Sequence, residues 1–108
     1  NVQQIKTKII VEAANIPMKP EIEHDLVKKG VLIIPDFVAN AGGVISSYVE
    51  FIGGSEKEMF SMVKEKITAN TRLVLERARG GNLREAALEI AEERVISAME
   101  KRCNCKIK

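Results

Sequence analysis

The sequence predicts an α/β chain: half of a doubly wound parallel sheet, followed by C-terminal helices. Two short, β-branched apolar runs, residues 7–12 and 31–34, predict strands, and the segment between them can form one helix. Amphipathic stretches fill the rest of the 108 residues, with glycine pairs between them. A chain of this length is one domain at most. Two parallel strands do not make a stable sheet alone, so we expect the chain to pack against further protein.

Local signals predict the first strand–helix–strand unit. The run 7–12 meets a small, polar, proline-containing stretch, where a strand gives way to a loop. Pro20 and the acidic residues after it suit the first turn of a helix, and Gly30 suits its C-terminal cap. The strand over 31–34 then completes a right-handed parallel crossover. Because neither strand alternates polar and apolar residues, we expect both to be buried on two faces.

Three helices are predicted after the second strand. Residues 40–43 are predicted to form a loop, and a helix follows over 44–52. Ser55 with Glu58, and Asn82 with Glu85, have the spacing of N-terminal capping boxes, which predicts two more helix starts. The predicted buried stripe of the first of these helices is Phe60, Val63, Ile67, Val74 and Ala78. That of the last helix is Leu88, Ala91, Val95, Ala98 and Met99.

Composition excludes several classes of function. Seventeen basic and fifteen acidic residues give a net charge of +2, and aromatic residues are scarce, so neither nucleic acid nor a membrane is an expected partner. No apolar run approaches the roughly 20 residues of a membrane span, and the N-terminus does not resemble a signal peptide. Cys103 and Cys105 are interpreted as free thiols, because a zinc site needs four ligands and His24 is the only histidine. The cytoplasm is the expected location, and no metal is expected.

Two loops are the candidate binding elements. Asn15 follows the first predicted strand, and Asn40 with Gly42 and Gly43 follows the second. Ligands of open α/β sheets bind at the carboxyl ends of parallel strands. Asparagine can donate and accept hydrogen bonds, and glycine admits a ligand close to the backbone. The alternative is that these residues only turn the chain, and spacing alone leaves both readings open. No catalytic residue is expected here, since Ser47 has no histidine to act as its base.

Several motifs in series carry a family resemblance. They are Lys8–Pro17 (KIIVEAANIP), Gly30–Asp36 (GVLIIPD), Ala39–Val44 (ANAGGV), Ser47–Phe51 (SYVEF), Asn82–Ala87 (NLREAA) and Ala91–Val95. In this order they resemble the glutamate/leucine/phenylalanine/valine dehydrogenase family, and more closely the C-terminal third of its glutamate-specific branch. The resemblance covers nearly the whole chain. The family usually has glycine where this chain has Ala13 and Ile16, and tryptophan where it has Phe51.

The resemblance implies a partial Rossmann-like fold and a set of site residues. Asn15 would lie at the ribose of NAD or NADP. Asn40, Ala41 and Gly42 would line the nicotinamide, and Ser47 would reach the side-chain carboxylate of glutamate. Residues 1–54 would then be a partial nucleotide-binding βαβα unit, and 55–108 a C-terminal helical segment that packs on it.

The implied reaction is oxidative deamination of L-glutamate to 2-oxoglutarate and ammonia, with hydride transfer to NAD(P)+, in a homo-oligomer. The family's catalytic lysines and aspartate lie upstream of the matched region, so this chain alone is predicted to be inactive. The alternative is a stand-alone helical interaction or regulatory module derived from such an enzyme.

Overall fold

The computed structural model describes residues 2–103 of the chain. A short 3-10 turn, η1 (Val2–Gln4), precedes the first strand. The remaining elements are β1 (Ile9–Val11), α1 (Pro20–Lys28), β2 (Leu32–Ile34), α2 (Asp36–Ala39), α3 (Gly42–Phe51), α4 (Glu56–Ala78) and α5 (Leu83–Cys103). The predicted fold class is confirmed: a parallel strand–helix–strand unit leads into a series of helices.

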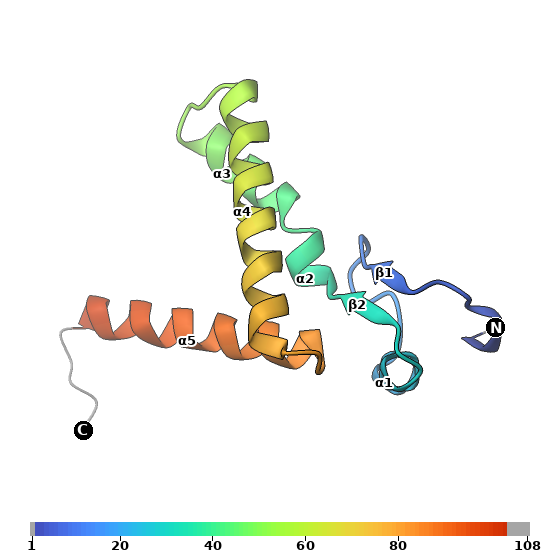
Figure 1. Ribbon diagram of the computed structural model, residues 1–108. Coiled ribbons are helices and arrows are strands. Elements are labelled where there is room, and N and C mark those ends of the chain that lie inside the picture. The colour runs from blue at the N-terminus through green and yellow to red at the C-terminus, as the bar shows by residue number, and fades with distance from the viewer. Residues whose placement is uncertain (1, 104–108) are drawn as a thin grey trace.

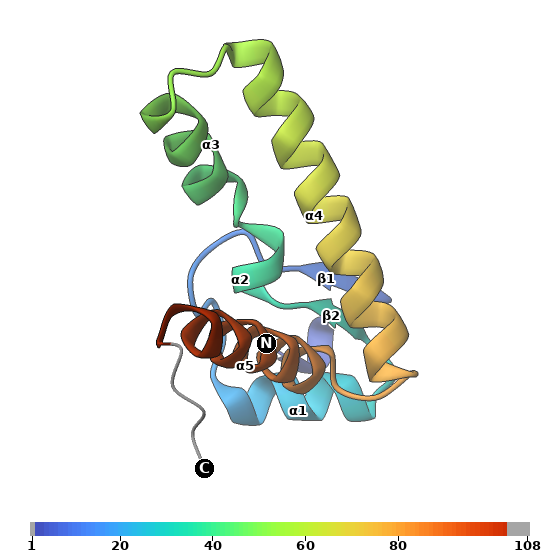
Figure 2. The ribbon, with the colours of Figure 1, turned by 90° about the vertical axis from the view of Figure 1, so that its left-hand side faces the viewer.

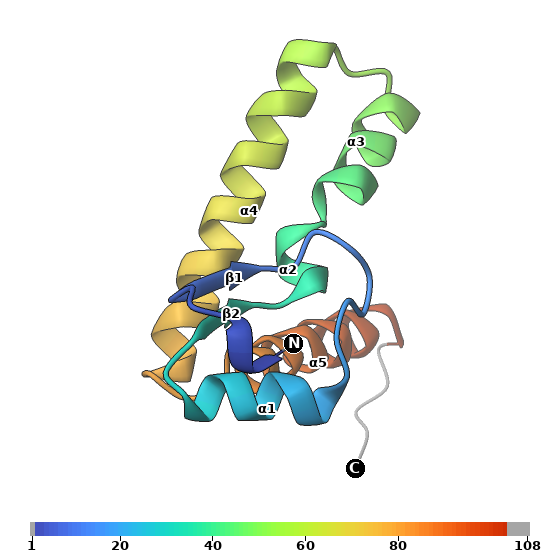
Figure 3. The same ribbon diagram turned by 90° about the vertical axis from the view of Figure 1, so that its right-hand side faces the viewer.

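The two strands form a parallel sheet, with Ile9 opposite Leu32 and Val11 opposite Ile34. Helix α1 runs beneath them as the crossover (Figure 3). Leu26 of α1 is 1% exposed and packs with Val31 and Ile33 in one apolar cluster. The backbone of Gly30 is left-handed, with φ of 82°, as its predicted capping role requires.

A second apolar cluster joins β2 to the long helices. Ile34 and Val38, on either side of the start of α2, pack with Val74 of α4 and with Leu83 and Ile90 of α5. This contact brings the N-terminal half of α5 against the crossover unit. Because of this packing, the first turns of α5 lie beside the loops that follow β1 and β2.

The predicted helix caps are confirmed. The Ser55 hydroxyl accepts the Glu58 backbone N–H, and the Glu58 carboxylate accepts the Ser55 backbone N–H at 2.7 Å. The Asn82 side chain accepts the backbone N–H groups of Arg84 and Glu85 at the start of α5. These local interactions fix where both long helices begin.

The predicted boundary between loop and helix after β2 is wrong. Residues 36–39 form the short helix α2, and α3 begins at Gly42 rather than Val44. The Pro35 carbonyl accepts the N–H groups of Val38 and Ala39, so the turn begins as soon as the strand ends. Only Asn40 and Ala41 separate the two helices.

Two predicted patterns of burial are also wrong. Strand β1 is not buried on both faces, since Ile9 is 56% and Val11 61% exposed. In α5, all five members of the predicted stripe are exposed: Leu88, Ala91, Val95, Ala98 and Met99. The buried side of α5 is instead made by Leu83, Ala86, Ala87 and Ile90. In α4, Phe60 of the predicted stripe is also exposed, at 61%.

The molecule is flat and branched (Figures 1 and 2). Helix α3 lies along one half of α4, and α5 leaves the other end of α4 in a different direction. The radius of gyration is 16.5 Å, against about 13 Å for a compact chain of 108 residues. The accessible surface is 8556 Å², against about 6,000 Å² for a compact protein of 12.0 kDa. Among the helices of the described part, none has the length and apolar character needed to cross a membrane.

Candidate functional site at the ends of the parallel strands

The structure brings the two predicted asparagines together. Asn40 Nδ2 donates a hydrogen bond of 2.7 Å to Asn15 Oδ1, across 25 positions of sequence. Because β1 and β2 are parallel, the loops after them emerge at the same edge of the sheet. Asn15 is exposed and Asn40 half-buried. The Asn15 amide nitrogen and the Asn40 amide oxygen therefore remain available to a ligand at this edge.

The residues after Asn40 differ in the space around them. A Cβ on Gly42 would lie 3.3 Å from Val63 Cγ1 and 3.7 Å from Ile67 Cδ1 of α4. A Cβ on Gly43 would meet nothing within 4 Å. A side chain on Gly42 would therefore press on α4, and its absence suits the close approach of α3 to α4, whereas Gly43 has open space beside it. Ala41 is half-buried at the N-terminus of α3.

Ser47 lies on α3, and its hydrogen bond is made within that helix and not to the asparagine pair. Its hydroxyl donates to the Gly43 carbonyl one turn earlier, at 3.1 Å, and the residue is exposed. Ser46 donates to the same carbonyl at 2.8 Å. The two neighbouring serines thus make the same bond within the helix, and Ser47 has the more open side chain.

A cluster of charged side chains beneath the asparagine loops was not predicted from the sequence. Arg84, in the first turn of α5, donates to Glu12 Oε2 at 2.6 Å, to Glu23 Oε2 at 2.7 Å and to Asp36 Oδ1 at 3.0 Å. The three carboxylate side chains are only 0%, 8% and 9% exposed, and that of Arg84 is 27% exposed. The guanidinium also lies over the Phe37 ring, 5.6 Å from its centroid.

This cluster shifts its carboxylates in opposite directions. The backbone N–H of Ile16 donates to Asp36 Oδ2 at 2.8 Å and lowers the pKa of that carboxyl. Burial raises the pKa of Glu12, against the opposing effects of the Asp36 backbone N–H and Arg84. Glu12 Oε1 is buried without a hydrogen-bond partner among the described residues. The distances in sequence between Arg84 and its partners, 48 to 72 residues, explain why no local motif indicated the cluster.

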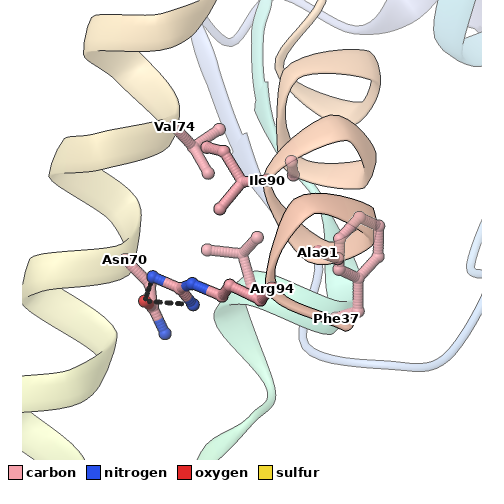
Figure 4. Close-up of a pocket in the computed structure, with 8 residues that line it drawn as sticks. Phe37, Asn70, Val74, Ile90, Ala91 and Arg94 are labelled. Carbon is pink, nitrogen blue, oxygen red and sulfur yellow. Dashed lines mark hydrogen bonds between the residues drawn. The ribbon is translucent and has the colours of Figure 1, made fainter. Parts of the chain in front are cut away.

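A small cavity lies between α4 and α5, next to α2 (Figure 4). Its volume is about 140 Å³, and Phe37, Val74 and Ile90 give it a mainly apolar wall. Arg94 is its one cation, and both terminal nitrogens of Arg94 donate to Asn70 Oδ1 at 3.1 Å. Since that charge is already engaged, the strand-end loops remain the better candidate for a polar ligand.

The described residues hold no group of three or more histidine, cysteine, aspartate or glutamate side chains placed to bind a metal ion. His24 is exposed on α1. Cys105 lies outside the described residues. At the strand ends the carboxylates of Glu12 and Asp36 are buried, whereas the more accessible side chains of Asn15 and Asn40 are amides, which suit recognition of a ligand.

A comparison with protein families decides the relationship. The family model for Glutamate/Leucine/Phenylalanine/Valine dehydrogenase matches residues 1–103. The chain belongs to this dehydrogenase family. The resemblance read from its motifs is thereby confirmed, and the match extends through the helices α4 and α5.

Relatives within the family agree with this assignment. The chain is 42% identical over 114 residues to a glutamate dehydrogenase of Aeropyrum pernix, covering 94% of this chain and 27% of that protein. It is 34% identical to an NADP-specific glutamate dehydrogenase of Saccharolobus shibatae, and 34% to an NADP(+)-dependent glutamate dehydrogenase of Pyrobaculum calidifontis. Each match covers 94% of this chain and 26% of the relative, so the chain spans about a quarter of their length.

A solved structure has the same fold. The L-tryptophan dehydrogenase of Nostoc punctiforme superimposes with a TM-score of 0.77 at 35% identity, over 89% of this chain and 30% of that protein. The arrangement of β1, β2 and the helices is therefore shared with an amino-acid dehydrogenase of known structure.

Proposed function

We propose that this chain is the C-terminal part of the cofactor-binding domain of an NAD(P)-dependent glutamate dehydrogenase. The reaction would convert L-glutamate, NAD(P)+ and water to 2-oxoglutarate, ammonia and NAD(P)H. The observation that carries the proposal is the Asn15–Asn40 hydrogen bond at the carboxyl ends of two parallel strands. Family membership, and the names of the glutamate dehydrogenase relatives, supply the reaction.

The residues at the strand ends fit a nicotinamide dinucleotide. When bound, this cofactor accepts the hydride of the substrate on its nicotinamide ring. In the proposed site Asn15 faces the ribose, and the Asn40 amide with Ala41 and Gly42 lines the nicotinamide. The open space beside Gly43 leaves room for a planar ring. NAD and NADP both suit these residues, because neither asparagine is charged.

Residues 1–54 are proposed to be the nucleotide-facing βαβα unit, with 55–108 as helices that hold it. The accessible surface, 8556 Å², is larger than that of a compact chain of this mass by about 2,500 Å². Exposed Ile9 and Val11 on β1 form part of that surface. We propose that the rest of the enzyme covers these residues and supplies the acid–base groups. In the alternative, a stand-alone module, this surface would meet a different protein.

Ser47 is proposed to bind the side-chain carboxylate of glutamate. Its hydroxyl is exposed on α3, one helix after the asparagine loop. In the full-length enzyme, Ser47→Ala should raise KM for glutamate about 10- to 150-fold and leave KM for the dinucleotide nearly unchanged. This range corresponds to the roughly 1.5–3 kcal/mol of a hydrogen bond to a charged group.

Ser46→Ala is the matched control, since it removes the same type of bond to the Gly43 carbonyl from the neighbouring residue. Steady-state assays with glutamate, leucine, phenylalanine and valine, each with NAD+ and NADP+, test the reaction itself. Absence of glutamate-dependent reduction of both dinucleotides by the full-length protein would contradict the proposed function. Equal effects of Ser46→Ala and Ser47→Ala on KM for glutamate would contradict the proposed role of Ser47 and leave the rest of the proposed function standing.

A further inference from the structure

Asp36 connects helix α5 to both asparagine loops. Its Oδ1 accepts from Arg84 at 3.0 Å, and its Oδ2 accepts the backbone N–H of Ile16 at 2.8 Å. Its backbone carbonyl accepts the N–H of Asn40 at 2.8 Å. One residue therefore holds the backbone immediately after Asn15 and the backbone of Asn40 itself.

The Ile16 backbone needs this support. Its φ is 45°, in the left-handed region. A β-branched residue is an outlier there, and such a conformation persists only where the surroundings over-determine it. The side chain is 80% exposed and so has little packing to hold it. The hydrogen bond from its N–H to Asp36 is thus the restraint that acts on Ile16 itself, beside the Asn40–Asn15 bond in the same loop.

Arg84 in turn fixes the carboxylate of Asp36. Its guanidinium uses three nitrogens on three carboxylates, from the end of β1, from α1 and from the start of α2. Glu12 Oε2 also accepts the backbone N–H of Asp36 at 3.0 Å, so the network closes on itself. A planar, forked cation can meet three such acceptors at once, whereas a lysine ammonium lacks that geometry.

We propose that Arg84 is a positioning residue for the cofactor site: by holding Asp36, it sets the Ile16 backbone and thereby the Asn15–Asn40 pair. The inference rests on the proposed function, because that function gives the pair its ligand. Arg84 itself makes no contact with the substrate or the dinucleotide in this proposal. It acts from α5, through the first residue of α2.

The kinetic test uses the full-length enzyme with Arg84→Lys and Arg84→Gln. A displacement of about 1 Å in a positioned group can cost about 100-fold in rate. We expect kcat/KM for the dinucleotide to fall about 10- to 100-fold in both variants, with a smaller change in KM for glutamate. Arg77→Lys and Arg77→Gln are matched controls, because Arg77 forms an exposed, two-bonded pair with Glu93 between α4 and α5 and has no partner in common with Arg84. They should match the wild type.

Residue-resolved hydrogen exchange gives a readout that does not depend on turnover. The Ile16 amide should exchange faster in both Arg84 variants. The Gly54 amide, bonded to the Val49 carbonyl at 2.8 Å, should exchange at the wild-type rate. Even if the wild type oxidises no glutamate, and the proposed function fails, the Ile16 amide still reports whether Arg84 holds the loop.

Three outcomes would overturn the inference. They are an Ile16 amide whose exchange does not change, an Arg84→Lys enzyme with wild-type kinetics for the dinucleotide, and equal loosening of the Ile16 and Gly54 amides. The last would mean that Arg84 supports the fold in general and not this loop.

Discussion

Replacing Arg84 with methionine should destabilise the chain far more than the same change at Arg77. Methionine keeps much of the apolar length of the side chain and removes the charge. At Arg84 it leaves Glu12, Glu23 and Asp36, none more than 9% exposed, without their cation. Removing one partner from such a buried network costs about 3–5 kcal/mol.

The exposed pair sets the lower end of the comparison. Arg77 and Glu93 are 39% and 60% exposed in their side chains. Exposed pairs contribute about 0–1 kcal/mol, and those with good geometry lie near the upper end. We therefore expect the two methionine variants to differ by about 2–4 kcal/mol, a large share of the roughly 5–15 kcal/mol that stabilises an ordinary domain.

Urea unfolding of this chain, followed by circular dichroism at one fixed protein concentration, measures the difference. The concentration is fixed because association would stabilise the folded state by mass action. The gap between the variants should narrow as the pH falls below about 4. Folding lowers the pKa of Asp36 below its ordinary value of 3.8. Its carboxylate therefore stabilises the folded state in full at a pH above 3.8, and this stabilisation is lost as the pH falls through the lower, folded-state pKa. A difference below about 1 kcal/mol at neutral pH would refute the role of Arg84 as the hub of a buried network.

Two further predictions concern the chain by itself. It should show no glutamate-dependent reduction of NAD(P)+, because the groups expected to orient the reactants lie upstream of the matched region. Orientation alone can account for about 7–11 kcal/mol of a barrier. Turnover above blank, in protein free of host enzyme, would count against this prediction. The chain should also form a dimer or higher oligomer, since the many exposed large apolar residues, among them Ile9 and Val11 on β1, favour self-association. Sedimentation that shows a well-folded monomer at ~100 μM, far above the ~1 μM that corresponds to about −8 kcal/mol, would contradict that expectation.

Features set by neighbouring residues could be predicted from the sequence. The capping groups of Ser55 and Asn82 act on N–H groups two or three residues ahead, so their spacing is visible in the chain. The proximity of Asn15 and Asn40 also followed from sequence, because parallel strands must end at one edge. In both cases a short-range or topological rule fixes the answer without knowledge of the packing.

Arg84 shows where such rules stop. In the sequence it stands between a capping asparagine and a glutamate, as an ordinary charged residue of a first helical turn. Asp36 follows Pro35, just after the strand predicted over 31–34, with no nearby residue that marks it as an ion-pair partner. Their ion pair depends on how α5 crosses the sheet unit, and that depends on packing around Val74 and Ile90. Motifs of neighbouring residues therefore cannot predict a contact between residues 48 positions apart.

Helix α5 shows why the periodicity of apolar residues predicted the wrong buried side. This helix has apolar residues on two sides: Leu83, Ala86, Ala87 and Ile90 are buried, whereas Leu88, Val95 and Met99 are half exposed. Periodicity finds both sides and cannot rank them, because the exposed side is as apolar as the buried one. Apolar residues on both sides of a helix are typical of a helix that is covered on more than one side. The exposed side of α5 therefore belongs to the surface that, under the proposed function, the rest of the enzyme would cover.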